Sequence, residues 1–482
     1  MITYTSLQAA VAAISTSVKS VLVSGSETLS ADLTIPSTLE VTLAKGAIIT
    51  LGNYDLTING PFNGSLSQHF SCSGTGVVTF GTGAVKEIYP EWWGDNTTPG
   101  TTDMAPAIQA AITASRSSGV VSLLGETYAL FTGVVIANPG THIKGKSREH
   151  TELLYNGTDD AAVCYHSSVT NSAISRCGIS DLKISAGTGT SKIGLDIHGG
   201  FILDVSRVGV IGFTGGIGIR EKNHGSSSSI QVNYYDVQIY RCLTGIQFTS
   251  ENSGVQYGSE SSIYGGSIGW DDSVAAFTGI DLVYGNTIRM YGPTIFCEGA
   301  AYIAGSVGVK VGGDITLVNI NLPVIENMEY GIQIAAGASR ISVIEPSYTG
   351  NNTNFSDSGT NTIYMYNGTI ACPVIEPSNS ITFKTGIDDA EINNCYIVNG
   401  RTSDGILNVR AGGTAILALN HNTGREAKYY GGGTTELINL EPDGDIKLTV
   451  AGKGLIMINA ANTVTKRVRL NDAGDGLLFG DE

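Results

Sequence analysis

The sequence has few charged side chains and, among them, few basic ones. Charged residues make up 15% of the 482 residues, which is low for a helical enzyme. Lys and Arg number 27 against 43 Asp and Glu, and the formal net charge is −16. Such a chain lacks the positive surface that attracts nucleic acids and anionic membranes. We therefore expect no nucleic acid partner and no membrane insertion, whereas polysaccharides remain open as partners.

The sequence also lacks the patterns that mark metal-binding, secreted or membrane-spanning chains. Its seven cysteines are odd in number and include no Cys-x-x-Cys pair, which favours buried free thiols over disulfides or metal ligands. No apolar run approaches membrane-spanning length, and no basic segment followed by an apolar run marks a secretion signal. An Asp cluster of calcium-binding type is missing as well. We expect no metal and no cofactor.

Glycine is abundant, with 63 residues, and a short strand motif repeats. Similar strands begin at Gly194, Gly216, Gly245, Gly279, Gly308 and Gly331. Intervals of 22, 29, 34, 29 and 23 residues suit the coils of a β-solenoid with loops of variable length. A β-propeller, the alternative, would need a steadier period. Alternation along each strand turns the aliphatic residues inward and leaves polar residues facing water, namely Asp196, Gln247, Asp281, Lys310 and Gln333.

The clearest helical pattern lies at about 102–116. Thr102 or Asp103 supplies an N-cap oxygen, and Pro106 occupies the first turn, where a missing N–H costs nothing. Apolar residues then recur at helical spacing, at Met104, Ala107, Ile108, Ala111 and Ile112. Almost nothing helical follows this segment. We expect the helix to act as a lid over the open end of a long β structure.

The chain divides into three predicted parts. Residues 1–88 read as a small β module for capping or attachment, 89–400 as the solenoid with its lid helix, and 401–482 as separate strands without the repeat motif. Short strands that cannot build a core alone are better explained by packing between chains. The last part is therefore predicted to be a β-rich trimerisation module.

The entry to the solenoid resembles a known family. Trp92-Trp93-Gly94-Asp95, then Thr102-Asp103 opening the helix, then Gly125-Glu126-Thr127-Tyr128, is similar to the signature of pectate-lyase-like right-handed β-helices in bacteriophage tailspikes and capsule depolymerases. The resemblance implies an all-β, right-handed parallel β-helix and a homotrimer attached to a phage tail or baseplate. It also implies a location on the virion and action on polysaccharide at the bacterial surface. A phage protein released by lysis needs no secretion signal.

Acidic residues recur just before the repeated strand. They are Asp271, Asp272, Glu298, Glu326, Glu345 and Glu376. Adjacent coils lie about 4.7–4.9 Å apart, so outward acids would form a ladder. A glycosidase needs two such carboxyls, about 5–5.5 Å apart for retention and about 6.5–9.5 Å for inversion. We predict Glu298 and Glu326 as the catalytic pair, with Asp271 or Asp272 as the alternative partner.

The alternative is that these acids have only a structural role and form hydrogen bonds to backbone amides of the turns. Pro346 and Pro377 directly follow Glu345 and Glu376 and suggest plain corners. Aromatic and basic side chains in the same zone could bind sugar rings and hydroxyls. The predicted substrate-binding residues are Trp270, Tyr264, Arg289 and Tyr291, although each would also serve as ordinary packing.

The predicted function is a tailspike that binds a bacterial capsule, exopolysaccharide or O-antigen and depolymerises it by endo-glycosidic hydrolysis. A polysaccharide lyase on the same fold is one alternative, for which His224 in a polar loop could supply the base. A non-catalytic receptor-binding spike is the other alternative.

Overall fold

A computed structural model describes most of the chain between residues 6 and 371, together with strands between 405 and 480. The gaps are 15–16, 116–118, 167–172, 224–228, 251–259, 272–275, 300–301, 361, 367–368, 372–404 and the connections between the later strands. The chain forms two compact units, Met1–Tyr396 and Ile397–Glu482. Neither described helix has the length and apolar character needed to cross a membrane.

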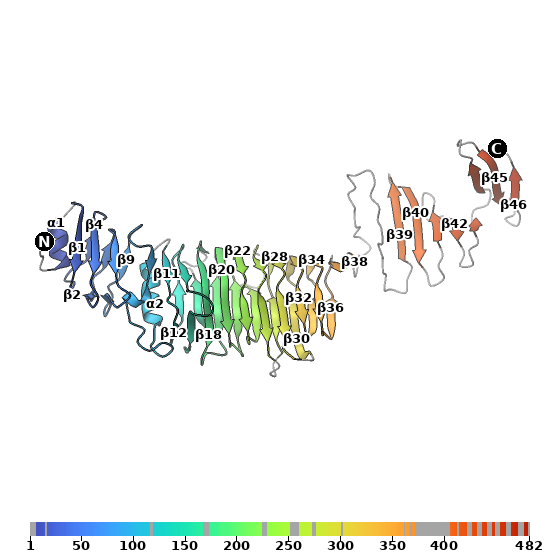
Figure 1. The fold of residues 1–482 in the computed structure, drawn as a ribbon. Helices are drawn as coiled ribbons and strands as arrows, with labels where there is room; N and C mark the ends of the chain where they lie inside the picture. Colours follow the sequence, from blue (N-terminus) through green and yellow to red (C-terminus); the bar gives the residue numbers. More distant parts are fainter. Residues whose placement is uncertain are drawn as a thin grey trace. The chain divides into compact units, whose positions relative to one another are not determined.

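The first segment of the larger unit is itself a short solenoid. Three parallel sheets of three strands each stack coil upon coil, so that Leu33, Leu56 and Val78 share one register column. The strands are β1 (Lys19–Val23), β4 (Leu39–Leu43), β7 (Phe62–Gly64), β2 (Glu27–Thr28), β5 (Ile49–Thr50), β8 (Phe70–Ser71), β3 (Leu33–Ile35), β6 (Leu56–Ile58) and β9 (Val78–Phe80). Helix α1 (Leu7–Ile14) lies at the N-terminal end of these coils (Figure 1).

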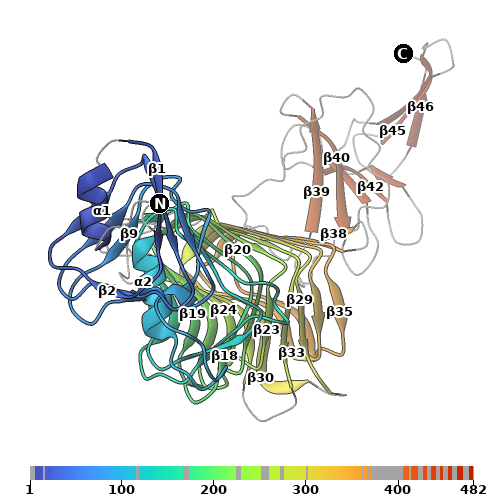
Figure 2. The ribbon, with the colours of Figure 1, turned by 60° about the vertical axis from the view of Figure 1, so that its left-hand side comes forward.

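Helix α2 (Ala105–Ala114) occupies a different position from the expected lid. It contacts β9 of the N-terminal coils as well as β11 (Val120–Ser122) and β13 (Val134–Ile136) of the coils that follow. The helix therefore lies at the junction between two stretches of solenoid, because coils precede it as well as follow it (Figure 2). Pro106 is in the first turn as predicted, and Asp103 Oδ1 accepts hydrogen bonds from the backbone N–H groups of Ala105 and Phe131.

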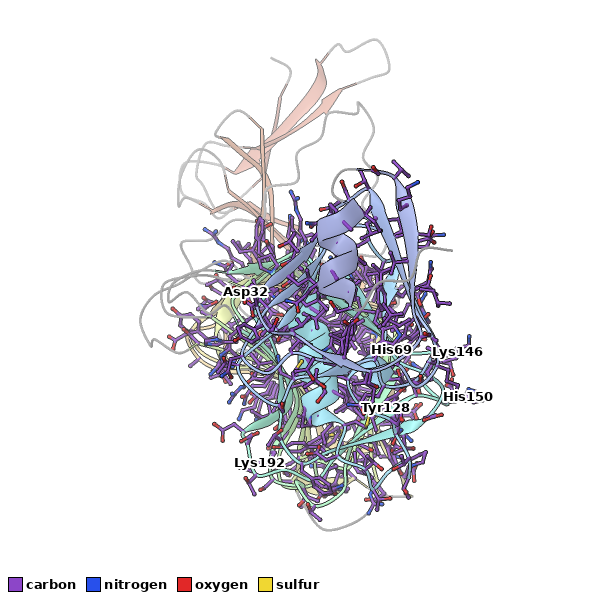
Figure 3. The ribbon with its side chains drawn as sticks, turned by 90° about the vertical axis from the view of Figure 1, so that its left-hand side faces the viewer. Asp32, His69, Tyr128, Lys146, His150 and Lys192 are labelled. Carbon is purple, nitrogen blue, oxygen red and sulfur yellow. The ribbon has the colours of Figure 1, made fainter. Side chains whose placement is uncertain are left out.

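The signature tryptophans form part of the core at this junction. Trp92 and Trp93 are 4% and 9% exposed and lie within an aromatic cluster. Its other members are Phe62, Phe70, Phe80 and Tyr89. Figure 3 views this end of the chain, with Lys146 and His150 at the outer edge. Tyr128 is fully buried, and its hydroxyl donates to Glu91 at 2.6 Å.

Most coils of the main solenoid have three strands, parallel to their neighbours above and below (Figure 1). The coil of β20 (Gly200–Ile211) and β21 (Ile217–Lys222) has two, because β20 runs through a corner and pairs with both β22 (Ile230–Tyr235) and β23 (Gln238–Tyr240). One face is a nine-stranded sheet of β13, β16 (Ala161–His166), β19 (Ile193–His198), β21 (Ile217–Lys222), β24 (Thr244–Thr249), β27 (Thr278–Leu282), β30 (Ile303–Val311), β33 (Met328–Ile334) and β36 (Thr353–Asp357). The other faces belong to a twenty-stranded sheet that bends at a corner. This arrangement confirms the predicted all-β parallel solenoid.

The bent sheet contains two strands from most coils and one long strand, β20, from the coil that precedes β22 and β23. In chain order it comprises β10 (Glu87–Ile88), β11, β12 (Thr127–Leu130), β14 (His142–Lys144), β15 (Glu152–Tyr155), β17 (Ile174–Ser175), β18 (Gly178–Ala186), β20 (Gly200–Ile211), β22 (Ile230–Tyr235), β23 (Gln238–Tyr240), β25 (Ser262–Tyr264), β26 (Ser267–Trp270), β28 (Gly285–Tyr291), β29 (Thr294–Cys297), β31 (Ile315–Asn321), β32 (Val324–Glu326), β34 (Ser339–Ile344), β35 (Ser347–Thr349), β37 (Ile363–Tyr366) and β38 (Thr369–Ala371). Its last pair, β37 and β38, is antiparallel.

The corner of this sheet is a column of residues in the left-handed backbone region. A single such residue turns a strand sharply without breaking the coil. The column comprises Asp181, Arg207, Asp236, Gly265, Gly292, Leu322 and Glu345, with φ between 47° and 66°. Glu345 is therefore a corner residue, and the interpretation of that position as a plain corner is confirmed.

The repeated glycines form a second column, on the nine-stranded face. A Cβ added at Gly245 would lie 2.4 Å from the Gly279 carbonyl oxygen and 2.4 Å from Ile268 Cγ2. Equivalent contacts occur at Gly194, Gly218, Gly279, Gly308 and Gly331. Only hydrogen fits where one coil approaches the next so closely. The second copy was predicted two residues too early, because Leu195 pairs with Ile219 and so aligns Gly194 with Gly218 instead of Gly216.

Polar residues between the aliphatic ones mostly face outward as expected. Gln247, Asp281 and Gln333 are partly exposed and Lys310 is exposed. Asp196 is the exception, at 2% exposure. The expectation that it faces water is wrong because Arg220 and His198 cover its carboxylate.

The cysteines of the described residues carry no disulfide. Cys177, Cys242 and Cys297 are buried as predicted, Cys164 is partly buried, and Cys72 is exposed. Cys372 and Cys395 lie outside the described residues.

The second unit is antiparallel, unlike the solenoid. Five strands form one sheet and three form another. They are β39 (Gly405–Ala411), β40 (Thr414–His421), β41 (Ala427–Tyr430), β42 (Glu436–Leu440) and β43 (Ile446–Leu448), then β44 (Gly454–Ile458), β45 (Val464–Leu470) and β46 (Leu477–Gly480). Its predicted role in trimerisation stays a prediction.

The carboxyl group of Glu221 lies inside the solenoid core. Glu221 on β21 is 2% exposed and accepts hydrogen bonds from Tyr234 Oη and Ser261 Oγ, each at 2.8 Å. Burial outweighs these hydrogen bonds and raises the pKa of Glu221 to about 7. The adjoining pocket, of about 10 Å³, has room for about one water molecule. It is too small for a sugar ring.

The glycine column makes a test of packing possible. Gly245→Ala should lower the free energy of unfolding by about 1–3 kcal/mol, because the added methyl meets a backbone oxygen that cannot move independently of its coil. The midpoint of urea unfolding measures the change. Gly25→Ala is the matched control, since a Cβ there meets nothing within 4 Å. Equal midpoints for the two variants would contradict the close approach.

The buried carboxyl should make stability depend on pH. The pKa of Glu221 rises from 4.5 to about 7 on folding, so the folded state holds a proton that the unfolded state has lost between these values. Stability from this group is therefore full below pH 4.5 and falls as pH rises to about 7, by about 3 kcal/mol. Urea unfolding at both ends of the range should show this loss in the wild type, relative to Glu221→Gln. Parallel pH profiles would rule it out.

Candidate functional site

Two of the predicted acids occupy the same position on neighbouring coils. Asp271 follows Trp270 at the end of β26, and Glu298 follows Cys297 at the end of β29, where Trp270 and Cys297 are register partners. The Glu298 backbone N–H donates to the Trp270 carbonyl at 2.7 Å. Asp271 is partly buried and Glu298 is exposed. Asp272, the other alternative partner, lies outside the described residues.

Glu326 does not continue this column. It pairs with Phe296 of β29, two residues before Glu298, and with Thr349 of β35. The expectation that Glu298 and Glu326 share one ladder is therefore wrong, although a catalytic role for either remains a prediction. The repeated Val-Ile-Glu sequence suggested equivalent positions that are not equivalent. Its first copy forms β32 and ends at Glu326, whereas its second copy ends β34 and places Glu345 at the corner. Glu376 lies outside the described residues.

Side chains from the preceding coil contact both aligned acids. Arg241 Nε lies 2.8 Å from Asp271 Oδ2, and the Tyr240 hydroxyl is hydrogen-bonded to Glu298. Burial and then this hydrogen bond raise the pKa of Tyr240. The guanidinium balances one of the two negative charges, so the acids can lie on adjacent coils. Sequence reasoning missed Tyr240 and Arg241, although both fall at the end of β23, the strand that pairs with β26.

A row of tyrosines lies on the same coils, before the corner. Tyr235, Tyr264 and Tyr291 are register partners, with ring centroids 5.0 and 5.2 Å apart and nearly parallel planes. Each is about 40% exposed. The structure thus brings together the predicted Tyr264 and Tyr291 and adds Tyr235. The sequence feature that could have identified Tyr235 is its position, because each of the three tyrosines directly precedes a corner residue.

Arg289 and Trp270 differ in their access to solvent. Arg289 is partly exposed and lies on β28 two residues before Tyr291, on the same side of the strand. Trp270 is only 2% exposed, and its ring stacks on Phe277 at 5.7 Å. The expectation that Trp270 offers a face to sugars is wrong, because it lies two residues after the inward Ile268 and points to the same side.

A separate polar cluster lies on the nine-stranded face. Asp196 accepts from Arg220 Nε at 2.9 Å and from Arg220 Nη2 at 2.6 Å, and His198 Nε2 lies 2.6 Å from Asp196 Oδ2. These partners lower the pKa of Asp196 to about 2 against the opposing effect of burial. Burial raises the pKa of the neighbouring Cys164 thiol to about 12, which disfavours a nucleophilic role. The signal in the sequence was Cys-x-His followed one coil later by Asp-x-His.

Comparison with protein families finds no match for this chain, and comparison with curated proteins finds none either. Solved structures with a related arrangement include ORF18 of Geobacillus virus E2, at 14% identity over 82% of this chain and 86% of that one, with a TM-score of 0.43. The Streptococcus pneumoniae surface protein and adhesin PfbA has 12% identity over 58% of this chain and 97% of its own, with a TM-score of 0.40.

A third similar structure is the receptor-binding protein of bacteriophage Det7, a podoviral tailspike. It has 13% identity over 99% of this chain and 96% of its own, with a TM-score of 0.21. By its own strand pairing, this chain is a parallel β-solenoid protein.

Proposed function

We propose that this chain is a phage tailspike that binds a bacterial surface polysaccharide along its solenoid and hydrolyses it within the polymer. The observation that carries the proposal is the alignment of Asp271 and Glu298 on adjacent coils, on the same two coils as Tyr264 and Tyr291. Two carboxyl groups and exposed aromatic side chains on the same two coils supply both parts of a glycosidase site.

The two acids take different roles in this proposal. Asp271, paired with Arg241, serves as the nucleophile, and Glu298, exposed and bonded by Tyr240, donates a proton to the leaving oxygen. Glu298 then accepts a proton from the water that releases the sugar. Coils about 4.8 Å apart suit the shorter carboxyl separation, which predicts retention of configuration.

The tyrosine row supplies the binding surface. The stacked rings cover one another's faces, so a sugar meets their exposed edges and hydroxyl groups. Arg289 adds a hydrogen-bond donor on the same strand as Tyr291. A row that crosses successive coils suits a polymer, which meets several rings at once. The antiparallel strands of the second unit support a homotrimer on the virion tail, since short strands gain a core by packing between chains.

Removal of either aligned acid tests the hydrolysis. Asp271→Asn and Glu298→Gln should each lower the rate about 10²–10⁴-fold, because each loses its part in proton transfer or nucleophilic attack. The assay is release of reducing ends from purified capsular, exopolysaccharide and O-antigen preparations, with proton NMR for the configuration of the first product. Glu326→Gln is the matched control, since Glu326 pairs with Phe296 and not with Glu298.

A non-catalytic receptor-binding spike is the second candidate. It is favoured by the Arg241–Asp271 ion pair, because such a pair can also serve only to hold neighbouring coils together. If the wild type binds polysaccharide but releases no reducing ends, the non-catalytic spike is supported. Products with a new carbon–carbon double bond would identify a lyase. Equal losses in Glu326→Gln and Glu298→Gln would contradict the assignment of the pair.

Binding can be tested apart from cleavage. In the Asp271→Asn background, Tyr264→Ala should weaken polysaccharide binding about 2–10-fold, the loss expected for one hydrogen bond of about 0.5–1.5 kcal/mol. Surface plasmon resonance on immobilised polysaccharide measures the change. Tyr54→Ala is the control, since Tyr54 has the same 39% exposure as Tyr264 but lies in the N-terminal coils. Unchanged binding in Tyr264→Ala would exclude the tyrosine row.

A further inference from the structure

Four potential metal ligands lie together on two neighbouring strands of the nine-stranded face. Cys164 and His166 are on β16, and Asp196 and His198 are on β19. Register pairs Cys164 with Asp196 and His166 with His198. Because alternate residues of a strand point to one side, all four side chains share a face. They form two rows of two, one coil apart.

The distances within this group are short. One ligand atom from each of Cys164, Asp196 and His198 lies within 4.8 Å of the others. The rings of His166 and His198 have centroids 4.9 Å apart. Bond lengths of about 2.0–2.3 Å around tetrahedral zinc would bring ligand atoms to about 3.3–3.8 Å from one another. Asp196 Oδ2 and His198 Nε2 are 2.6 Å apart in a hydrogen bond, so metal binding would replace that bond with two bonds to the ion.

We propose that Cys164, His166, Asp196 and His198 form a transition-metal site, with zinc as the ion that fits it. Thiolate and imidazole favour zinc over calcium or magnesium, which take oxygen ligands. On binding, the Cys164 thiol gives its proton to solvent, and the two imidazoles bind through unprotonated nitrogens. The thiolate and the Asp196 carboxylate then supply two negative charges against the two positive charges of the ion and the one of Arg220.

Arg220 is compatible with this site. Its guanidinium contacts both oxygens of Asp196. Each carboxylate oxygen has two lone pairs. Oδ2 contacts both Arg220 Nη2 and His198 Nε2, whereas Oδ1, among the described residues, contacts only Arg220 Nε and so has a position for the metal. Arg220 thereby orients the ligand, as partners behind metal ligands commonly do. The ion would fasten β16 to β19 on a face that carries neither Asp271 nor Glu298, so the site is independent of the proposed hydrolysis.

Cobalt provides a direct probe of these ligands. The full chain is first stripped with a chelator and then titrated with Co²⁺. It should show a thiolate charge-transfer band and the visible bands of tetrahedral cobalt. Both signals should saturate at one ion per chain and disappear when Zn²⁺ displaces the cobalt. Cys164→Ser should abolish the charge-transfer band. Cys72→Ser is the control and should retain it, because Cys72 lies on β8's exposed end far from this face in sequence and register. His166→Gln should lower the zinc affinity at least 10-fold.

Stability gives a second readout. Zinc should raise the thermal unfolding midpoint of the wild type and of Cys72→Ser, but not of Cys164→Ser. If Cys164→Ser proves unfolded by circular dichroism, the His166→Gln comparison decides. A wild type that binds no Co²⁺ or Zn²⁺ at micromolar concentration, or cobalt spectra that are the same for both cysteine variants, would overturn the proposal and leave an ion-pair network of Asp196, His198 and Arg220.

Discussion

The structure depends on the close approach of successive coils at the glycine column. A Cβ at Gly279 would lie 2.6 Å from the Gly308 carbonyl oxygen and 2.4 Å from Ile295 Cγ2. From Gly194 to Gly331, one coil therefore stacks on the next in a register that aligns these glycines, and Ala162 and Asn354 take the same position in the coils before and after them. Once that register is fixed, every outward side chain belongs to a column, and residues far apart in sequence become neighbours across about 4.8 Å. The acid pair, the tyrosine row and the Cys/His/Asp cluster are all products of this stacking.

The solenoid was predictable from the sequence because its strand motif is local and repeats. The register between strands of successive coils was not predictable. Loops of different length separate the strands, and sequence spacing does not reveal where the additional residues lie. The copy at Gly216 was therefore two residues out of step, and Glu326 fell beside Phe296 instead of Glu298. The N-terminal coils escaped notice for a related reason, since their strands are only two to five residues long.

The candidate site was predictable in part. Asp271, Glu298, Tyr264 and Tyr291 follow strands whose alternation is clear, and the structure brings each pair together on adjacent coils. The error at Trp270 was avoidable, because period-two alternation from the inward Ile268 turns the indole into the core. Tyr240 and Arg241 belong to an earlier coil, and only three-dimensional stacking relates them to the acids.

The turn after β32 shows how backbone groups are satisfied where a coil leaves the bent sheet. Asn327 Nδ2 donates there to the carbonyl oxygens of Cys297 and Gly299, each at 3.0 Å. A neutral amide thus satisfies the backbone where one coil leaves the bent sheet. The two preceding coils carry acids after the same sheet, although like charges on adjacent coils repel and here require Arg241 as a counter-charge. In the proposed hydrolysis, these two acids are the paired carboxylates that the reaction uses.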